Sequence, residues 1–233
     1  TGGPSRQASF QLASHARERG AATVYDPNLR LNLWDSPEEA RSVILSAMQW
    51  ADIVKVSEEE LAFLREKNCK VALILRDLTE AGVSASDGME DGLRAVEAAK
   101  ALGVPDHAGV ALFAEIRPEW SVSHNWMLTF AETLVAAGYV PGFIGNTDSS
   151  KNFNFDRQCS HYVQATDSVD ELRPVYWATE PKVEGEPEEW APYCPSALTP
   201  EEMDLWQSGV IRYGDITANE DYIRQESLLE RMW

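Results

Sequence analysis

Short apolar runs along this chain alternate with segments whose apolar residues recur at helical spacing. Runs without strict inside/outside alternation are typical of buried strands of a parallel sheet, and most are followed by a predicted helix. The predicted strands are residues 22–25, 52–56, 71–75, 109–114, 142–145, 162–165, 175–179 and 210–213. The predicted helices are residues 7–19, 35–50, 57–67, 87–102, 122–137, 200–206 and 220–233. This alternation predicts an α/β domain.

Helix start and stop signals support several of these boundaries. Pro37 follows two candidate capping residues, Asp35 and Ser36, and precedes two glutamates, which is the order expected at a helix N-terminus. Ser57 and Glu60 have the spacing of a capping box. Gly103 and Gly138 follow predicted helices, where glycine commonly ends a helix.

Eight strands, most of them followed by a helix, predict a closed (β/α)8 barrel of the TIM type. The chain has 233 residues, above the roughly 200 that such a barrel needs. No linker rich in Pro, Gly or Ser divides it, so we predict a single domain over residues 1–233. An open, doubly wound α/β sheet is the alternative fold.

Charge and composition exclude several partners. Asp and Glu outnumber Lys and Arg by 38 to 20, for a net charge of −18, which repels nucleic acid and anionic lipid. No apolar run reaches the ~20 residues of a membrane span. The three cysteines and four histidines show no metal-ligand spacing. We therefore expect no nucleic-acid or membrane partner, no metal and no cofactor.

One segment resembles a sugar kinase. Residues 16–64 contain DPNLR, beginning at Asp26, and ADIVKVSEEEL, beginning at Ala51, and these resemble ribokinase-type kinases of the fructokinase branch. The GAGD-type loop that supplies the catalytic base and the anion hole in that family is absent from the sequence. Without such a loop, phosphoryl transfer is not expected.

A second resemblance covers residues 57–233. The motifs SEEELAFLREKNCKVALI, DGLRAVEAAKALGVP, GVALFAEIRPEW, AAGYVPGFIGN, VYWATEP and IRYGDITAN are similar to a glycoside-hydrolase-like domain of secreted bacterial proteins, a barrel related to lysozyme-type muramidases. The chain therefore has the pattern of a chimera, with residues 1–56 kinase-like and residues 57–233 hydrolase-like. The resemblance implies an extracellular or cell-envelope location, with a cytoplasmic one as the alternative. It also implies that Cys159 and Cys194 lie near enough to form a disulfide.

Two carboxylates are the predicted catalytic residues. Glu115 directly follows the most apolar predicted strand, and Asp26 follows the first strand, so a barrel would bring both to its C-terminal face. Glycoside cleavage needs such a pair, one protonated and one ionised. The related family has a second acid two residues after the first, where this chain has Arg117. That departure argues against hydrolysis.

Further polar and aromatic residues near predicted strand ends are candidates for substrate binding: Asp77, Arg117, Trp120, Asn146, Trp177, Tyr213 and Asp215. Structural alternatives stay open for several candidates. Asp26 before a proline is also typical of a turn. Glu115 could form an ion pair with Arg117 or Arg76, and the aromatic residues could belong to the core.

The expected function is that of a glycoside-hydrolase-like barrel that acts on or binds a cell-wall-type glycan. One alternative is a catalytically silent binding or scaffold domain. Another is an inactive fragment of a ribokinase-type sugar kinase.

Overall fold

A single curved sheet organises the molecule. The computed structural model describes residues 3–19, 23–28, 30–48, 50–51, 53–55, 70–75, 77–151, 153–179, 189–213 and 216–233. The strands lie in the spatial order of the sequence. They are β1 (Val24–Tyr25), β2 (Ile53–Lys55), β3 (Lys70–Leu75), β4 (Ala111–Glu115), β5 (Val140–Gly145), β6 (Val175–Ala178), β7 (Leu205–Tyr213) and β8 (Ile216–Ile223).

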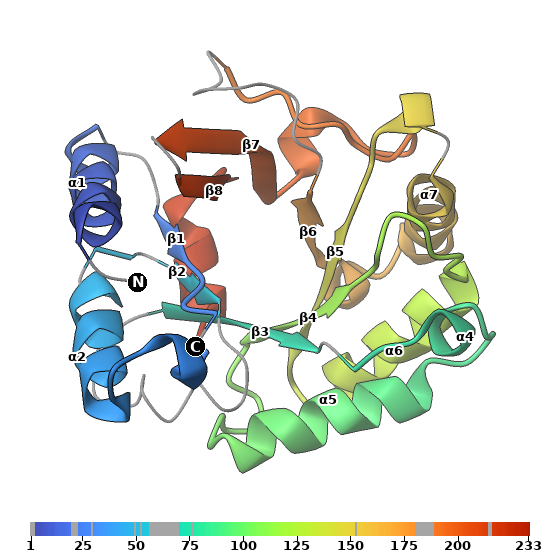
Figure 1. The fold of residues 1–233 in the computed structure, drawn as a ribbon. Coiled ribbons are helices and arrows are strands. Elements are labelled where there is room, and N and C mark those ends of the chain that lie inside the picture. Colours follow the sequence, from blue (N-terminus) through green and yellow to red (C-terminus); the bar gives the residue numbers. More distant parts are fainter. Residues whose placement is uncertain are drawn as a thin grey trace.

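The sheet is a half-barrel and not a closed one. All eight strands pair in sequence order, and the six from β3 to β8 form the mixed, mostly parallel half-barrel that curls around one side of the molecule (Figure 1). Neighbouring strands are parallel from β1 to β7, and β8 pairs antiparallel with β7. Among the described residues, no ladder joins β8 to β1. The predicted (β/α)8 barrel is therefore wrong.

The C-terminal segment makes the fold differ from a closed barrel. We predicted a helix over residues 220–233, but β8 continues to Ile223 and is followed by a 3-10 helix, Glu226–Arg231. A (β/α)8 barrel needs an eighth strand parallel to its neighbours. Because β8 turns back against β7 as a hairpin, the sheet cannot close in that way.

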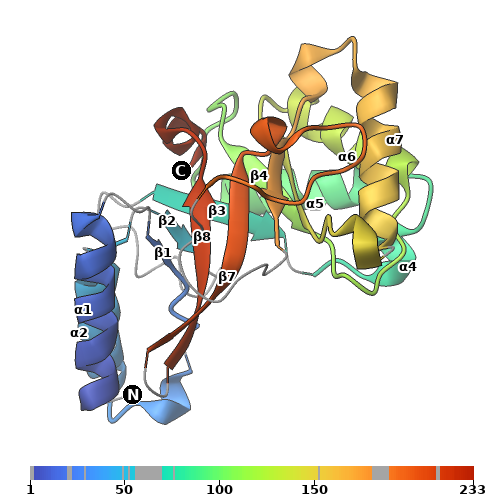
Figure 2. The same cartoon turned by 90° about the horizontal axis from the view of Figure 1, so that it is seen from above.

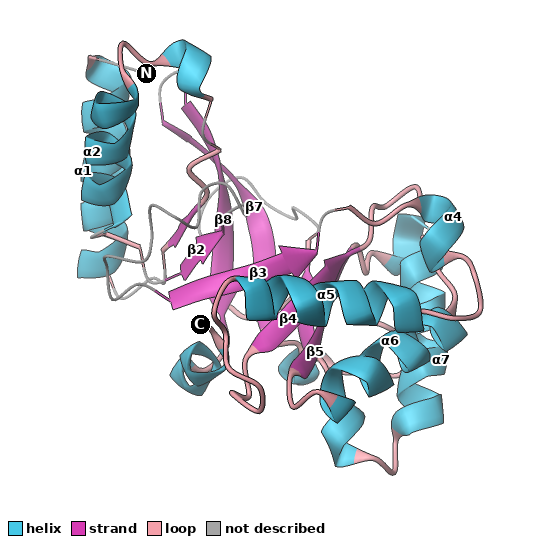
Figure 3. Ribbon diagram, turned by 90° about the horizontal axis from the view of Figure 1, so that it is seen from below, coloured by secondary structure: helices cyan, strands magenta, loops and turns pink. Residues whose placement is uncertain are grey.

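Helices α5 (Met89–Ala101), α6 (His124–Ala136) and α7 (Asn154–Thr166) cover the convex face of the half-barrel (Figures 1 and 3), with the short α4 (Glu80–Val83) beside them. Because these helices share one face, the alternative doubly wound sheet is also wrong. The core under α6 is aromatic: Phe130 stacks on Trp126 with ring centres 5.0 Å apart.

Two further predictions failed. Residues 162–165 were predicted as a strand but lie in α7, whose buried residues recur every three or four positions, as a helix requires: Phe155, Cys159, Tyr162 and Thr166. The predicted helix over residues 200–206 is only a 3-10 turn, Pro200–Glu202, and β7 begins at Leu205. Two other short 3-10 helices span Ser149–Lys151 and Asp170–Leu172. The predicted helix over residues 57–67 lies outside the described residues.

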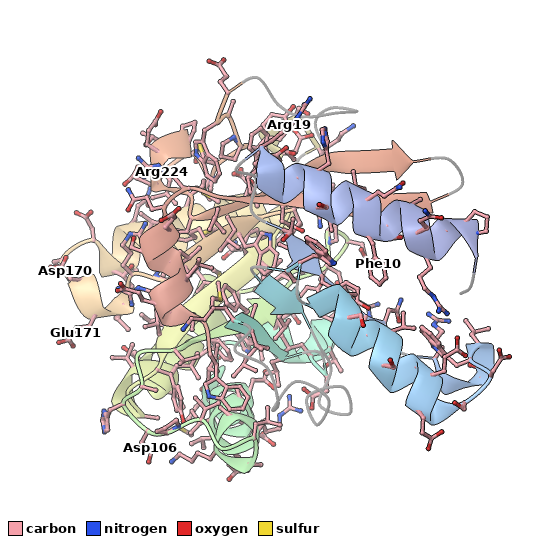
Figure 4. The ribbon with its side chains drawn as sticks, turned by 90° about the vertical axis from the view of Figure 1, so that its left-hand side faces the viewer. Phe10, Arg19, Asp106, Asp170, Glu171 and Arg224 are labelled. Atoms are coloured by element: carbon pink, nitrogen blue, oxygen red, sulfur yellow. The ribbon has the colours of Figure 1, made fainter. Side chains whose placement is uncertain are left out.

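Helices α1 (Pro4–Glu18) and α2 (Pro37–Met48) lie side by side, away from α5, α6 and α7 (Figure 2). Between them, a 3-10 helix covers Leu31–Leu33. Arg6 forms a 3.0 Å ion pair with Glu39, and Phe10 points from α1 toward α2 (Figure 4). This segment joins the main sheet where β2 pairs with β3.

The concave face carries its own apolar cluster, made of Ala72, Ala111, Phe113, Ile144, Val175, Trp177, Leu205, Leu228 and Met232. Leu228 and Met232 come from the C-terminal segment, and Trp233 exchanges two backbone hydrogen bonds of 2.7 and 3.1 Å with Val71 near the start of β3. The C-terminal segment therefore packs at the amino end of β3, and the carboxyl ends of the parallel strands lie at the opposite rim.

None of the described helices has the length and apolar character needed to cross a bilayer. Exposed acids such as Asp106, Asp170 and Glu171 lie at the periphery (Figure 4) and contribute to the net negative charge.

Candidate functional site

The carboxyl-end rim of the half-barrel brings Glu115 onto the concave face. Side chains of a strand alternate between its two faces, and Ala111 and Phe113 of β4 belong to the concave cluster. Glu115, two residues after Phe113, shares that face and is half-buried. The pairing register places it in one row across the sheet with Ile144, Trp177, Leu205 and Ile223.

A buried carboxylate that the sequence reasoning missed lies one row nearer the rim. Asp221 of β8 pairs with Gln207 of β7 and is only 6% exposed. Its Oδ1 accepts a 2.9 Å hydrogen bond from Nε1 of Trp177. The indole of Trp177 in turn meets Phe113 edge-on, with centres 5.7 Å apart. The apolar floor thus holds Asp221 in place through Trp177.

Asp221 was missed because residues 220–233 were predicted as a helix. In the structure, Tyr222 contacts Trp206 on the opposite face from Asp221 and Ile223. The sequence does not show this, because Asp221 and Ile223 share a face but differ in polarity and so give no apolar/polar alternation.

Trp177, predicted as a sugar-stacking residue, is 4% exposed and belongs to the floor. Asn146 follows β5 and is half-buried, and its Oδ1 accepts a 2.9 Å hydrogen bond from the backbone of Asp148. The neighbouring Thr147 donates to the carbonyl of Tyr193 at 2.8 Å. These bonds hold the loop after β5 at the rim.

Asp26 follows β1 and is exposed. Its Oδ1 accepts a 3.1 Å hydrogen bond from the backbone of Asn28, whose φ is 42°, so Asp26 forms a turn. Three strand-to-strand steps separate β1 from β4. At about 4.8 Å a step, the strands that carry Asp26 and Glu115 are already roughly 14 Å apart along the sheet. Carboxyl pairs of glycosidases are separated by about 5 to 9.5 Å.

Asp77 takes part in an ion-pair network on the convex side. It forms an ion pair with Arg94 of α5, and Arg94 also bonds to Asp91. Asp91 accepts a 2.8 Å hydrogen bond from Nε1 of Trp126. Asp77 therefore helps to anchor α5, and its side chain is engaged away from the concave face.

The loop after β4 presents Arg117 and Trp120 together. The guanidinium carbon of Arg117 lies 5.1 Å from the ring centre of Trp120, and the backbone of Trp120 donates to the Arg117 carbonyl at 3.0 Å. Such a cation–π contact is worth about 0.5–1 kcal/mol at an exposed site. The half-buried indole is thereby held at the rim.

Tyr213, another predicted site residue, is the last residue of β7 and pairs with Ile216 of β8. Asp215 lies outside the described residues.

The predicted disulfide between Cys159 and Cys194 is not formed in this structure. Cys159 is a free, fully buried thiol in α7, and Cys194 donates to the carbonyl of Leu198 at 3.3 Å. Burial, with a smaller contribution from the charge of Asp156, raises the pKa of the Cys159 thiol far above its usual value. Cys159 is therefore an unreactive core residue.

Asp156, in the first turn of α7, has a carboxyl oxygen, Oδ1, that is buried without a hydrogen-bond partner. Burial raises the pKa of its carboxyl above the value of about 3.9 in an unfolded chain. A raised pKa means that stability falls as pH rises through that range. We expect Asp156→Asn to increase the midpoint of thermal unfolding at pH 7 and to change it much less at pH 3. The matched exposed control, Asp170→Asn, should show no such pH dependence. A higher unfolding midpoint for Asp156→Asn at pH 3 but not at pH 7 would contradict this prediction.

Comparison with solved structures supports the half-barrel. The chain is similar to an uncharacterized protein of B. stearothermophilus whose crystal structure was determined at 1.07 Å, with a TM-score of 0.61 and 21% identity. The match covers 78% of this chain and 88% of that protein. At this level of identity the similarity shows the fold alone.

Comparison with curated proteins supports the kinase-like segment. The chain is 54% identical over 61 residues to putative fructokinase-8 of Arabidopsis thaliana, which is 26% of this chain and 29% of that relative. It is 57% identical over 61 residues to fructokinase-1 of rice, 19% of that relative. The chain thus spans less than a third of the fructokinases it matches.

No family model matches the chain. Part of the chain is similar in sequence to fructokinases, and its fold is similar to that of an uncharacterized protein. The resemblance to a muramidase-related TIM-type barrel is wrong, because the sheet is a half-barrel and the sequence similarity found is to fructokinases.

Proposed function

We propose that the carboxyl-end rim of the half-barrel binds a carbohydrate, with a cell-wall-type amino-sugar glycan as the ligand class. The observation that carries this proposal is a set of polar side chains toward the carboxyl-end rim of the concave face. Glu115 follows Phe113 on β4, Asp221 of β8 lies one row nearer the rim and accepts a hydrogen bond from Trp177, and Asn146 follows β5. Sugar sites commonly combine a few oriented polar groups with aromatic surface.

The proposal is for binding and not for efficient hydrolysis. Glu115 belongs to β4 and Asp221 to β8, four strand steps away. Carboxylates placed on distant strands are suited to hydrogen bonds with separate sugar units. The Trp120 indole beside the end of β4 contacts Arg117 and packs against the core under the helices, so it is not part of this site. A catalytically silent binding domain is thus the form of the function that this geometry supports best.

Titration with chitooligosaccharides by calorimetry tests the proposal. We expect Glu115→Gln to weaken binding roughly 10- to 150-fold, because a hydrogen bond to a charged group is worth about 1.5–3 kcal/mol. Glu119→Gln removes the same charge at an exposed position of the loop after β4 and should change the affinity less than twofold. Release of reducing ends should stay at the level of the buffer.

Two outcomes would end the carbohydrate proposal. One is the absence of binding by the wild type to amino-sugar oligomers and to soluble peptidoglycan fragments. The other is an equal loss of affinity in Glu115→Gln and Glu119→Gln, which would indicate only a general charge effect.

A further inference from the structure

Two histidines that are distant in sequence meet on the convex side of the half-barrel. His124 is the first residue of α6 and is half-buried, whereas His161 lies in α7 and is exposed. Their ring centres are 5.4 Å apart and the ring planes are inclined at 83°. The proposed carbohydrate site uses neither residue. We propose that this pair binds a divalent transition-metal ion of the Cu²⁺, Ni²⁺ and Zn²⁺ class.

Gln158 of α7 determines the tautomer of His124. Its Oε1 lies 3.1 Å from the backbone N–H of His124 and 3.0 Å from Nδ1 of the same residue. A backbone N–H can only donate, so the amide oxygen, and not the NH2 group, must face His124. Nδ1 therefore carries the proton, and Nε2 is left with its lone pair. Metal-bound histidines generally have this arrangement, with the other ring nitrogen donating to an oxygen.

The separation of the rings suits a shared metal. A metal–nitrogen distance of about 2.1 Å, plus roughly 1.1 Å from nitrogen to ring centre, puts each centre about 3.2 Å from the ion. Centres that are 5.4 Å apart then subtend roughly 115° at the metal, close to a tetrahedral angle. The inclination between the planes does not oppose this, because each ring can turn about its own metal–nitrogen bond. His161 is exposed and can orient without repacking.

Hydrogen bonds to α7 hold the N-terminus of α6, which carries His124. Asn154 and Gln158, both of α7, accept hydrogen bonds from the backbone N–H groups of Val122 and His124, at 2.6 and 3.1 Å. These bonds bind the start of α6 to α7. A metal bridge between His124 and His161 would join the same two helices.

Two electrostatic effects oppose each other here. The partial positive charge at the N-terminus of α6 disfavours a cation beside His124. The net charge of −18 raises the local concentration of cations. The favourable free energy of coordination by two imidazoles exceeds the unfavourable effect of the helix dipole on a bound cation.

The remaining coordination positions would hold water. Among the described residues, no group of three or more His, Cys, Asp and Glu side chains could hold a metal. A site with two imidazoles and open positions should follow the usual affinity order, with Cu²⁺ tighter than Ni²⁺ and Zn²⁺.

The test uses untagged protein freed of metal with a chelator and titrated separately with CuCl2, NiCl2 and ZnCl2 in a calorimeter. We expect one ion per chain and a rise in the unfolding midpoint with metal concentration. His124→Asn and His161→Asn should each weaken binding at least tenfold. His107→Asn is the control, because His107 lies elsewhere and has a φ of 58°, which asparagine adopts readily.

His161→Asn keeps the test decisive if His124→Asn fails to fold. His161 is exposed, so this variant should unfold at the wild-type temperature when no metal is present. The absence of binding by the wild type would overturn the proposal. Binding that neither histidine variant weakens, or that His107→Asn weakens equally, would overturn it as well.

Discussion

Replacing Phe130 with alanine should lower the free energy of unfolding by about 3–5 kcal/mol. Phe130 is fully buried in α6, stacks on Trp126, and lies 6.0 Å from the ring centre of Phe143 on β5. Alanine would remove the ring that joins the helix layer to the sheet and would leave a cavity that the surrounding rings cannot fill. For a domain of this size, the loss corresponds to a decrease of roughly 6–20 °C in the unfolding midpoint.

Leu93→Ala is the matched control for this prediction. Leu93 lies on α5 and is 49% exposed, so its truncation should cost about 0.5 kcal/mol or less. Thermal and denaturant unfolding of both variants provide the measurement. A loss below about 1 kcal/mol for Phe130→Ala would show that the aromatic cluster is not the main helix-to-sheet contact.

Gly142→Ala should lower the free energy of unfolding by about 1–3 kcal/mol, through overpacking. A Cβ at position 142 would lie 2.5 Å from Cδ1 of Phe113 on the neighbouring strand. Phe113 is fully buried and contacts Trp177, which donates to Asp221. The ring cannot shift without disturbing this indole–carboxylate hydrogen bond. A single methyl group should therefore affect the whole concave face.

The double variant Gly142→Ala/Phe113→Leu tests this cause. Leucine removes the ring atoms that the new methyl group would meet, so the second change should cost less in the Gly142→Ala background than in the wild type. The expected coupling is about 0.5–3 kcal/mol in denaturant unfolding. Strictly additive effects would rule out the contact with Phe113 as the reason for glycine at this position.

Local patterns in the sequence were sufficient for most of the central elements. The predicted strand over residues 71–75 corresponds to β3, and the run over residues 109–114 to β4. The predicted helices over residues 87–102 and 122–137 are α5 and α6 within two residues at each end. The two strand segments are apolar runs, and each of the two helix segments has a repeated apolar pattern with a glycine soon after its end. Local preference and tertiary packing therefore agree in these segments.

Predictions failed where local preference and tertiary pairing differed. The segment Ile216–Ile223 contains Asn, Glu and Asp, which do not favour strands, yet it pairs with β7 along its length. Asp221, near the end of this segment, is held by a hydrogen bond from Trp177 of β6. The placement of Glu115 near an apolar strand end followed from sequence, whereas Asp221 could be found only once β8 was seen to be a strand.

The sequence by itself determined the strand–helix alternation, the acidic charge and the kinase-like segment, because these depend on residues close together in the chain. Only the tertiary structure decided that the sheet stops as a half-barrel, since closure depends on the direction in which β8 pairs with β7. It also decided which side chains meet. His124 with His161, and Trp177 with Asp221, are pairs that no local spacing encodes, because long-range packing sets their distances.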